Sequence, residues 1–147
     1  MASSAWDSYI DTIIKYNGAD CACLASLDGN IWASSPELKP TADEIKTIVN
    51  NAANRCHDSV TINGKKLITL MAGDGELRAA GSEYAIDCRI LKTMVIITGN
   101  SKPKDCPGVN RLLAQAGCDM ASYLGPFDPL CAGIVTEGKK VGKYFWR

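Results

Sequence analysis

Hydrophobic residues near the start of the chain recur at the spacing of an amphipathic helix. Positions 6, 9, 10, 13 and 14 carry large apolar or aromatic side chains, which form one stripe of a helix with about 3.6 residues per turn. We predict a helix over residues 5–16 that ends at the Asn17-Gly18 pair, because glycine readily adopts the conformation of a C-terminal cap. An aromatic stripe of this kind usually faces a core.

Two further helices are predicted. The sequence Thr41-x-x-Glu44 is a capping box, and the apolar positions that follow it predict a helix that reaches about Asn54. The helical period returns over residues 107–124, and Gly125-Pro126 ends this third predicted helix. Gly117 weakens its middle, because glycine is a poor helix former.

Strand patterns fill most of the remaining sequence. Asp28-Gly29 and Asn63-Gly64 are two-residue hairpin signals, and Gly73-Asp74-Gly75 predicts another turn. The apolar run 93–98 is typical of a central strand that is covered on both faces. The predicted strands are 21–27, 30–34, 59–62, 66–71, 76–80, 84–90 and 93–98.

The order of these elements predicts an α+β fold. Consecutive short turns favour an antiparallel meander over a parallel sheet. We expect a central antiparallel β-sheet flanked by the N- and C-terminal helices on one face and a shorter helix on the other. The last helical period ends near the Gly125-Pro126 pair, so we predict one domain over residues 1–125 and a C-terminal extension over residues 126–147.

Composition and charge narrow the function. The chain has 147 residues, 46% of them hydrophobic and 22% charged, which is typical of one soluble globular domain. Its 16 basic and 16 acidic side chains cancel, so charge gives no support for a nucleic-acid partner. No apolar run approaches the roughly 20 residues that span a bilayer, and no signal peptide is evident. We therefore expect a cytoplasmic protein.

Seven cysteines and one histidine are the candidates for metal or catalytic chemistry. The cysteines are odd in number and irregularly spaced, without a Cys-x-x-Cys pair, which favours reduced core thiols over a zinc site. Cys56 and His57 are adjacent, so their side chains point in different directions and form a poor catalytic dyad. We predict no enzyme activity, no cofactor and no metal site. A metal- or redox-dependent enzyme that uses the cysteines is an alternative.

Several short motifs, taken in order, resemble the profilin family of actin-monomer-binding proteins. They are Trp6-x-x-Tyr9-Ile10-Asp11, Asp28-Gly29-x-x-Trp32-Ala33, Asn63-Gly64-x-Lys66, the apolar strand 93–98 and Met120-Ala121-Ser122-Tyr123-Leu124. The resemblance implies a monomeric adaptor in the cytoskeleton. One of its surfaces would bind monomeric actin, and the other would bind proline-rich assembly factors such as formins.

The resemblance implies an aromatic cradle for proline-rich segments, built from Trp6, Tyr9, Trp32 and Tyr123. A polyproline II helix is preformed, so it docks in an aromatic groove at little ordering cost. Indole and phenol groups can donate hydrogen bonds to its unpaired carbonyls. Core packing is the alternative role of Trp6 and Tyr9. Some relatives have His at the position of Tyr123. Compared with His, Tyr keeps a ring and a hydrogen-bond donor but is longer.

The resemblance also implies an actin-binding surface on the later strands and the exposed face of the last helix. Its residues would be Lys66, Arg78, Arg89, Asn110, Arg111, Gln115 and Asp119. Each of them has the alternative role of a solvated surface side chain. The last helix is less basic than in many animal relatives, so we expect actin binding that is retained but weaker.

The chain continues past the last predicted helix, whereas profilins normally stop near its end. Because profilins generally bind phosphoinositides, the basic residues of this segment are candidate contacts with an anionic membrane surface. These residues are Lys139, Lys140, Lys143 and Arg147. The alternatives are a tail that packs on its own domain, with residues 133–136 as an edge strand, or a disordered tail.

A scaffold module that resembles the longin or roadblock type is the alternative from a different class. Such modules are also built from a sheet and helices, and they serve in dimerisation or vesicle traffic. This alternative predicts a stable dimer that binds no polyproline, whereas the profilin resemblance implies a monomer.

Overall fold

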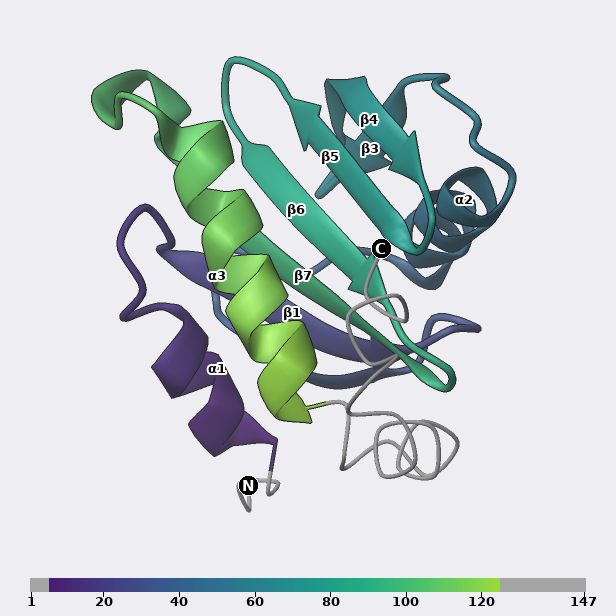
Figure 1. The fold of residues 1–147 in the computed structure, drawn as a ribbon, viewed down its shortest axis with the longest axis horizontal. Helices are drawn as coiled ribbons and strands as arrows, with labels where there is room; N and C mark the ends of the chain where they lie inside the picture. The colour runs from purple at the N-terminus through teal and green to yellow at the C-terminus, as the bar shows by residue number, and fades with distance from the viewer. Residues whose placement is uncertain (1–5, 125–147) are drawn as a thin grey trace.

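The computed structural model describes residues 6–124, which form an antiparallel sheet with helices on both faces (Figure 1). Within these residues the sheet has seven strands in the order β2-β1-β7-β6-β5-β4-β3. The strands are β1 (Cys21–Ser26), β2 (Ile31–Ser34), β3 (Val60–Ile62), β4 (Lys65–Gly73), β5 (Glu76–Ala80), β6 (Ala85–Ile90) and β7 (Met94–Asn100). The helices are α1 (Asp7–Ile13), α2 (Ala42–Ala53), the short 3₁₀ helix η1 (Pro103–Asp105) and α3 (Val109–Leu124).

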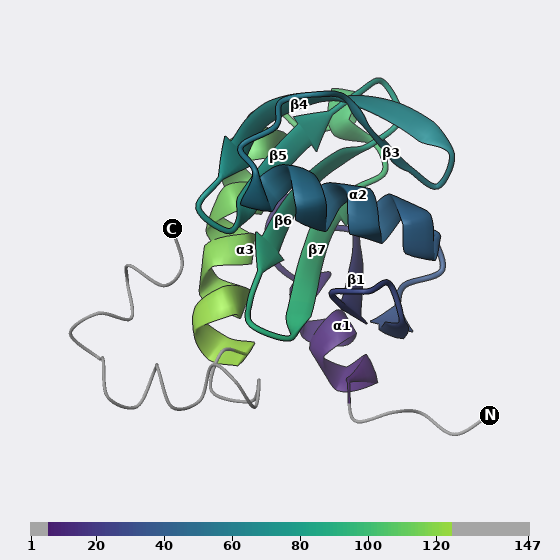
Figure 2. The same ribbon diagram turned by 90° about the vertical axis from the view of Figure 1, so that its right-hand side faces the viewer.

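The two faces of the sheet carry separate cores. On one face α2 packs Ile45 and Ile48 against inward side chains of the strands, among them Ile97 of β7 (Figure 2). On the other face Ile13 of α1 and Met120 of α3 belong to a second core with residues of β1 and β7. The predicted fold class and the placement of the helices are therefore confirmed.

Most predicted elements are present with small shifts at their ends. The capping box is confirmed, because Thr41 Oγ1 accepts from Glu44 N at 3.1 Å and Glu44 Oε1 accepts from Thr41 N at 2.9 Å. The same carboxylate accepts from Asn63 N and Gly64 N, at 3.1 and 2.9 Å, and so ties α2 to the β3–β4 turn. Both turn residues have positive φ, +52° and +78°, as an Asn-Gly hairpin requires.

Two local predictions were wrong. The first helix ends at Ile13 rather than residue 16, because the next backbone bonds, such as Tyr16 N to Ile13 O at 3.0 Å, are of the tighter i to i+3 kind. The first hairpin loop spans residues 27–30 rather than the two residues Asp28-Gly29. Ser26 Oγ binds both Asn30 N and the Asp28 carboxylate, and these bonds stabilise the longer turn.

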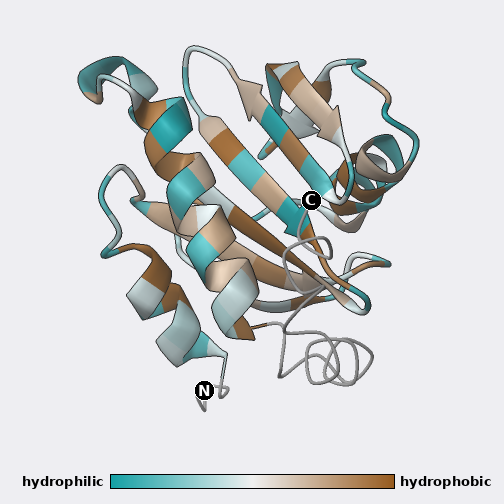
Figure 3. Ribbon diagram, in the orientation of Figure 1, coloured by the Kyte–Doolittle hydropathy of each residue, from teal (hydrophilic) through white to brown (hydrophobic). Residues whose placement is uncertain are grey.

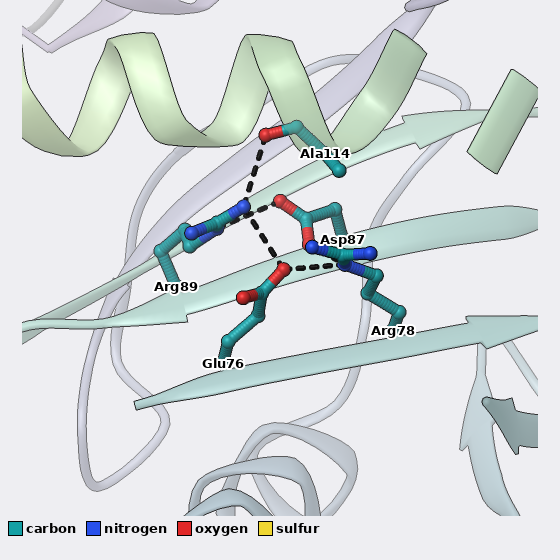
Figure 4. Close-up of polar contacts among 5 residues, drawn as sticks. All are labelled: Glu76, Arg78, Asp87, Arg89 and Ala114. Carbon is teal, nitrogen blue, oxygen red and sulfur yellow. Dashed lines mark hydrogen bonds and ion pairs between the residues drawn. The ribbon is translucent and has the colours of Figure 1, made fainter. Parts of the chain in front are cut away.

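Four charged side chains lie between the sheet and α3 (Figure 4). The register of β5 and β6 places Glu76 opposite Arg89 and Arg78 opposite Asp87. Arg89 Nη2 lies 2.9 Å from Glu76 Oε2, and Arg89 Nε lies 2.9 Å from Asp87 Oδ2. Arg78 Nε pairs with Glu76 and lies 3.6 Å from Asp87 Oδ1. We call these four residues the ion cluster; it contains two basic and two acidic side chains.

The ion cluster fixes the position of α3. Arg89 Nη2 donates to the carbonyl oxygen of Ala114 at 2.9 Å, which joins the cluster to the helix backbone. One turn further on, a Cβ atom at Gly117 would lie 1.9 Å from Asp87 Oδ2. Only glycine therefore lets the helix approach the buried carboxylate this closely. The residue that weakens the helix in isolation is the one that its packing on the sheet requires.

We expect Gly117→Ala to destabilise the fold by about 1–3 kcal/mol, because the new methyl group overpacks this interface. Helix propensity alone would stabilise the variant by about 1 kcal/mol. The unfolding free energy in urea measures the result. The intrinsic Gly-to-Ala difference comes from comparing Ser122→Gly with Ser122→Ala at an exposed position of the same helix. A stabilised Gly117→Ala variant would contradict the packing.

The ion cluster also changes the acidity of Asp87. Its carboxyl group is fully buried, and Oδ1 accepts no hydrogen bond from the described residues. Burial raises the pKa of Asp87 to about 7; the nearby Glu76 adds to the rise, and the Arg89 guanidinium opposes it. The folded chain therefore binds this proton more tightly than the unfolded chain, whose Asp pKa is about 3.9.

Stability from this group should be fully present below the unfolded pKa and be lost as the pH rises towards 7. We expect the unfolding free energy of the wild type, relative to that of Asp87→Asn, to fall between about pH 4 and pH 7. Urea titrations of both proteins across this range test the sign. A difference that rises with pH would show that the two guanidinium groups outweigh burial.

Candidate functional site

Four aromatic rings from three elements form a continuous row. Trp6 is the N-cap of α1, Tyr9 lies in α1, Trp32 in β2 and Tyr123 in the last turn of α3. The ring centroids are 5.1 Å apart for Trp32 and Trp6, 5.6 Å for Trp6 and Tyr9, and 5.8 Å for Tyr9 and Tyr123. All three pairs are tilted and lie at ordinary aromatic contact distances. We call these residues the aromatic row.

The aromatic row is partly buried and partly open. Trp6, Tyr9 and Trp32 are half-buried and pack against the core between α1, α3 and the sheet. Tyr123 is 55% exposed. The rings therefore contribute to the core and also leave aromatic surface accessible. The structure brings together the four residues that the sequence assigned to a cradle.

A groove between α1 and α3 continues the aromatic row. Its volume is about 640 Å³, and its lining residues are Thr12, Tyr16, Asp119, Met120, Ser122 and Tyr123. Tyr123 belongs to both the row and this groove, which we call the inter-helix groove. Asp119 accepts a hydrogen bond from Gln115 Nε2 at 3.0 Å.

A second groove lies on the other flank of α3. It measures about 480 Å³, and its lining residues are Arg78, Arg89, Asn110, Arg111, Ala114, Gln115 and Cys118. We call it the arginine groove. Five of the seven residues assigned to actin binding line it. Arg89 is nearly buried and offers little surface, whereas Asn110, Arg111 and Gln115 are exposed.

The other two assigned residues lie elsewhere. Lys66 is exposed on β4, outside the arginine groove. Asp119 lies on the flank of α3 that faces α1, in the inter-helix groove. The seven predicted residues thus divide into one cluster of five and two separate positions.

Two exposed apolar residues of β4 were missed by the sequence reasoning. Ile68 is 68% exposed and Leu70 is 50% exposed. Ile68 pairs with Ala80 of β5, on the same side of the sheet as Arg78, and a bulge follows at Thr69–Met71. Along β5 and β6 hydrophilic and hydrophobic residues alternate (Figure 3). The sequence feature that could have revealed them is that β4 carries apolar residues on both of its faces. In the structure one of these faces has no covering helix (Figure 1).

Of the six described cysteines, three are core thiols, whereas Cys56, Cys106 and Cys118 are half-buried. Cys21, Cys23 and Cys88 are buried, and burial raises the pKa of each, for Cys23 to about 12. Such thiols stay protonated and are poor nucleophiles. His57 is exposed, with Nδ1 3.2 Å from the carbonyl oxygen of Arg55. Across residues 6–124, no group of three His, Cys, Asp or Glu side chains is placed to hold a metal ion.

The predicted lipid contacts Lys139, Lys140, Lys143 and Arg147 lie outside the described residues, as do the extension 126–147 and the edge strand proposed at 133–136. Within residues 6–124 no helix is both long and apolar enough to cross a bilayer.

Comparison with known sequences gives one family. The sequence profile of the profilin family matches residues 4–120. A profilin of Drosophila melanogaster is 26% identical over 98 residues, which cover 64% of this chain and 78% of the relative. A profilin of Branchiostoma belcheri is 25% identical over 138 residues, which cover 90% of each chain.

Solved structures share the fold. Acanthamoeba castellanii profilin IB superposes with a TM-score of 0.69 at 22% identity, covering 82% of this chain and 96% of its own. LokiProfilin2, in a complex with rabbit actin, gives 0.65 at 14% identity and covers 84% and 97%. Mouse profilin IIa, in a complex with a double repeat from the FH1 domain of mDia1, gives 0.55 at 14% identity and covers 82% and 99%.

The family match spans most of the chain, and the seven-stranded sheet with its three packed helices agrees with it. The assignment replaces the scaffold-module alternative and the cysteine-dependent enzyme. The chain belongs to the profilin family of non-enzymatic actin-binding proteins, and it extends beyond the matched region at its C-terminus.

Proposed function

We propose that this protein binds proline-rich segments along the aromatic row and monomeric actin on the face that contains the arginine groove. The observation that carries the proposal is the meeting of four rings from α1, β2 and α3, with centroids 5.1 to 5.8 Å apart. A mouse profilin of the same fold forms a complex with a formin-type FH1 repeat, and LokiProfilin2 forms one with rabbit actin. Both complexes support the assignment of ligands.

The aromatic row has the chemistry that a polyproline II helix requires. Tilted rings present flat faces against which proline rings pack, and little side-chain entropy is lost because aromatic residues have few rotatable bonds. The indole N–H and phenol O–H groups can donate to the carbonyl groups of the ligand, which has no internal hydrogen bonds. The row therefore suits a ligand that is already extended.

The actin-binding face combines charge with exposed apolar surface. Arg78 is partly exposed, and Arg111 and Gln115 lie beside it on α3. Ile68 and Leu70 project from β4 without a covering helix. Apolar anchors surrounded by arginine and polar side chains are typical of protein–protein interfaces. The sparse charge of α3, which has Ala114, Ala116 and Gly117 at its centre, favours weaker binding than a basic helix would give.

The two surfaces lie on opposite flanks of α3. Tyr123 and Asp119 face α1, whereas Arg111 and Ala114 line the arginine groove. A proline-rich segment and an actin monomer therefore need not compete for the same residues. Such a ternary complex lets assembly factors receive monomers for filament growth in the cytoplasm.

For the proline-rich surface we expect decaproline to produce a saturable change in tryptophan fluorescence. Trp6→Ala should weaken the affinity by at least about tenfold, because central tryptophans often dominate interface free energies. Because Trp6 also packs on the core, Tyr123→Ala provides a second, surface-exposed variant. Ile68→Ala, on the other surface, is the matched control and should leave the affinity unchanged. Absence of binding at millimolar peptide by a folded wild type would contradict the proposal.

For the actin surface we expect Arg111→Glu to reduce the inhibition of actin assembly, because it reverses a charge in the arginine groove. Gln115→Lys should strengthen binding several-fold, because it restores a positive charge to the helix. Lys46→Glu, on the exposed side of α2 on the opposite face of the sheet, makes the same charge reversal as a control. Equal inhibition of actin assembly by Arg111→Glu and Lys46→Glu would argue against this surface. Tight sequestration of actin monomers by the wild type would argue against the expected weak binding.

A further inference from the structure

We propose that the inter-helix groove binds the side chain of a lysine or arginine that flanks a proline-rich segment, with Asp119 as the partner of its charge. This inference rests on the proposed binding of proline-rich segments to the aromatic row. It assigns to the protein a preference for proline-rich ligands that carry a positive charge at one end.

The inter-helix groove is continuous with the aromatic row. Tyr123 lines the groove and also contacts Tyr9, with the ring centroids 5.8 Å apart. Asp119 precedes Tyr123 by four residues in α3, so the two side chains lie on one flank of the helix, one turn apart. A ligand that follows the rings as far as Tyr123 therefore leads directly to Asp119.

The lining of the groove suits a long cationic side chain. Among residues 6–124, Asp119 is the one charged residue that lines it, and no cation of this part of the chain pairs with its carboxylate. Gln115 occupies one position on Oδ1, and a carboxylate can accept several more hydrogen bonds. The half-buried ring of Tyr16 offers apolar contact for an aliphatic stem, and the Ser122 hydroxyl can accept from its charged head.

Lys15 places a positive charge close to the groove. Lys15 lines a neighbouring hollow of about 230 Å³ together with Thr12 and Tyr16, two residues that the hollow shares with the inter-helix groove. Lys15 does not line the groove itself. Because Lys15 is exposed, water and salt screen its repulsion of a ligand cation. The attraction from direct contact with Asp119 therefore outweighs this repulsion.

The spacing of the residues sets the position of the cation. The four residues from Asp119 to Tyr123 advance about 6 Å along α3, and a polyproline II helix rises about 3.1 Å per residue. The charged residue should therefore lie about two residues beyond the proline that packs against Tyr123. A partly exposed ion pair of this kind strengthens binding by about two- to fivefold.

The test compares five peptides by tryptophan-fluorescence titration. One is decaproline alone, and the other four carry Gly-Lys or Gly-Gln as additional residues at the C-terminus or at the N-terminus. The proteins are the wild type, Asp119→Asn and Asp11→Asn. Asp11→Asn changes the net charge as Asp119→Asn does. Asp11 is exposed in α1 and does not line the groove, so this variant serves as the matched control.

We expect the wild type to bind a lysine-bearing peptide about two- to fivefold more tightly than its glutamine counterpart, at one end or the other. The preference should disappear in Asp119→Asn, persist in Asp11→Asn and shrink with added salt. Equal affinity of the wild type for both peptides, or an unchanged preference in Asp119→Asn, would overturn the inference while leaving binding to the aromatic row intact. Failure of decaproline itself to bind would instead overturn the proposed function, and this inference with it.

Discussion

The position of α3 on the sheet depends on the contact between Gly117 and the buried carboxylate of Asp87. Glycine is the only residue that leaves room for Asp87 Oδ2, and Arg89 completes the contact by donating to the carbonyl oxygen of Ala114. Because the carboxylate lies directly beneath the helix, sliding α3 along its axis would put a side chain against it. Both candidate surfaces contain residues of α3, so both depend on this contact.

The ion cluster is better understood as a device for orientation than as a source of stability. Buried ion pairs lose much of their attraction to the cost of removing charges from water, and apolar replacements are often as stable. Removal of one partner is different, because it leaves an uncompensated buried charge. Glu76 and Asp87 hold Arg78 from the buried side, and part of its side chain reaches the arginine groove. Less side-chain entropy is therefore lost when a ligand meets this arginine than when it meets a free lysine.

The parts of the fold that the sequence predicted are those that depend on local patterns. The hydrophobic periods located the helices and strands, and the capping box at Thr41 and the turn at Asn63 follow from side chains close in sequence. The length of the first hairpin loop was mispredicted because Ser26 bonds across it, and the Asp28-Gly29 signal does not encode that bond. Local patterns specify elements well and loop geometry less well.

The candidate site was only partly predictable, for a related reason. The aromatic row was anticipated through the family motifs, since periodicity alone favoured a buried stripe for Trp6 and Tyr9. The ion cluster was not anticipated, although β5 and β6 each carry opposite charges two residues apart; their pairing depends on the register between strands. Gly117 looked like a defect because its role comes from Asp87, which is 30 residues away in sequence.

The two flanks of α3 are linked by one polar contact, which limits how strongly their ligands can influence each other. Gln115 lines the arginine groove, and its side-chain amide donates to Asp119 in the inter-helix groove. A ligand that draws either side chain away breaks this bond, whose net contribution is about 1 kcal/mol, and so changes affinity on the other flank by about fivefold at most. The backbone of α3 adds little, because the ion cluster and Gly117 hold it in one position. The proposed adaptor would therefore carry its two ligands nearly independently, as delivery of a bound monomer requires.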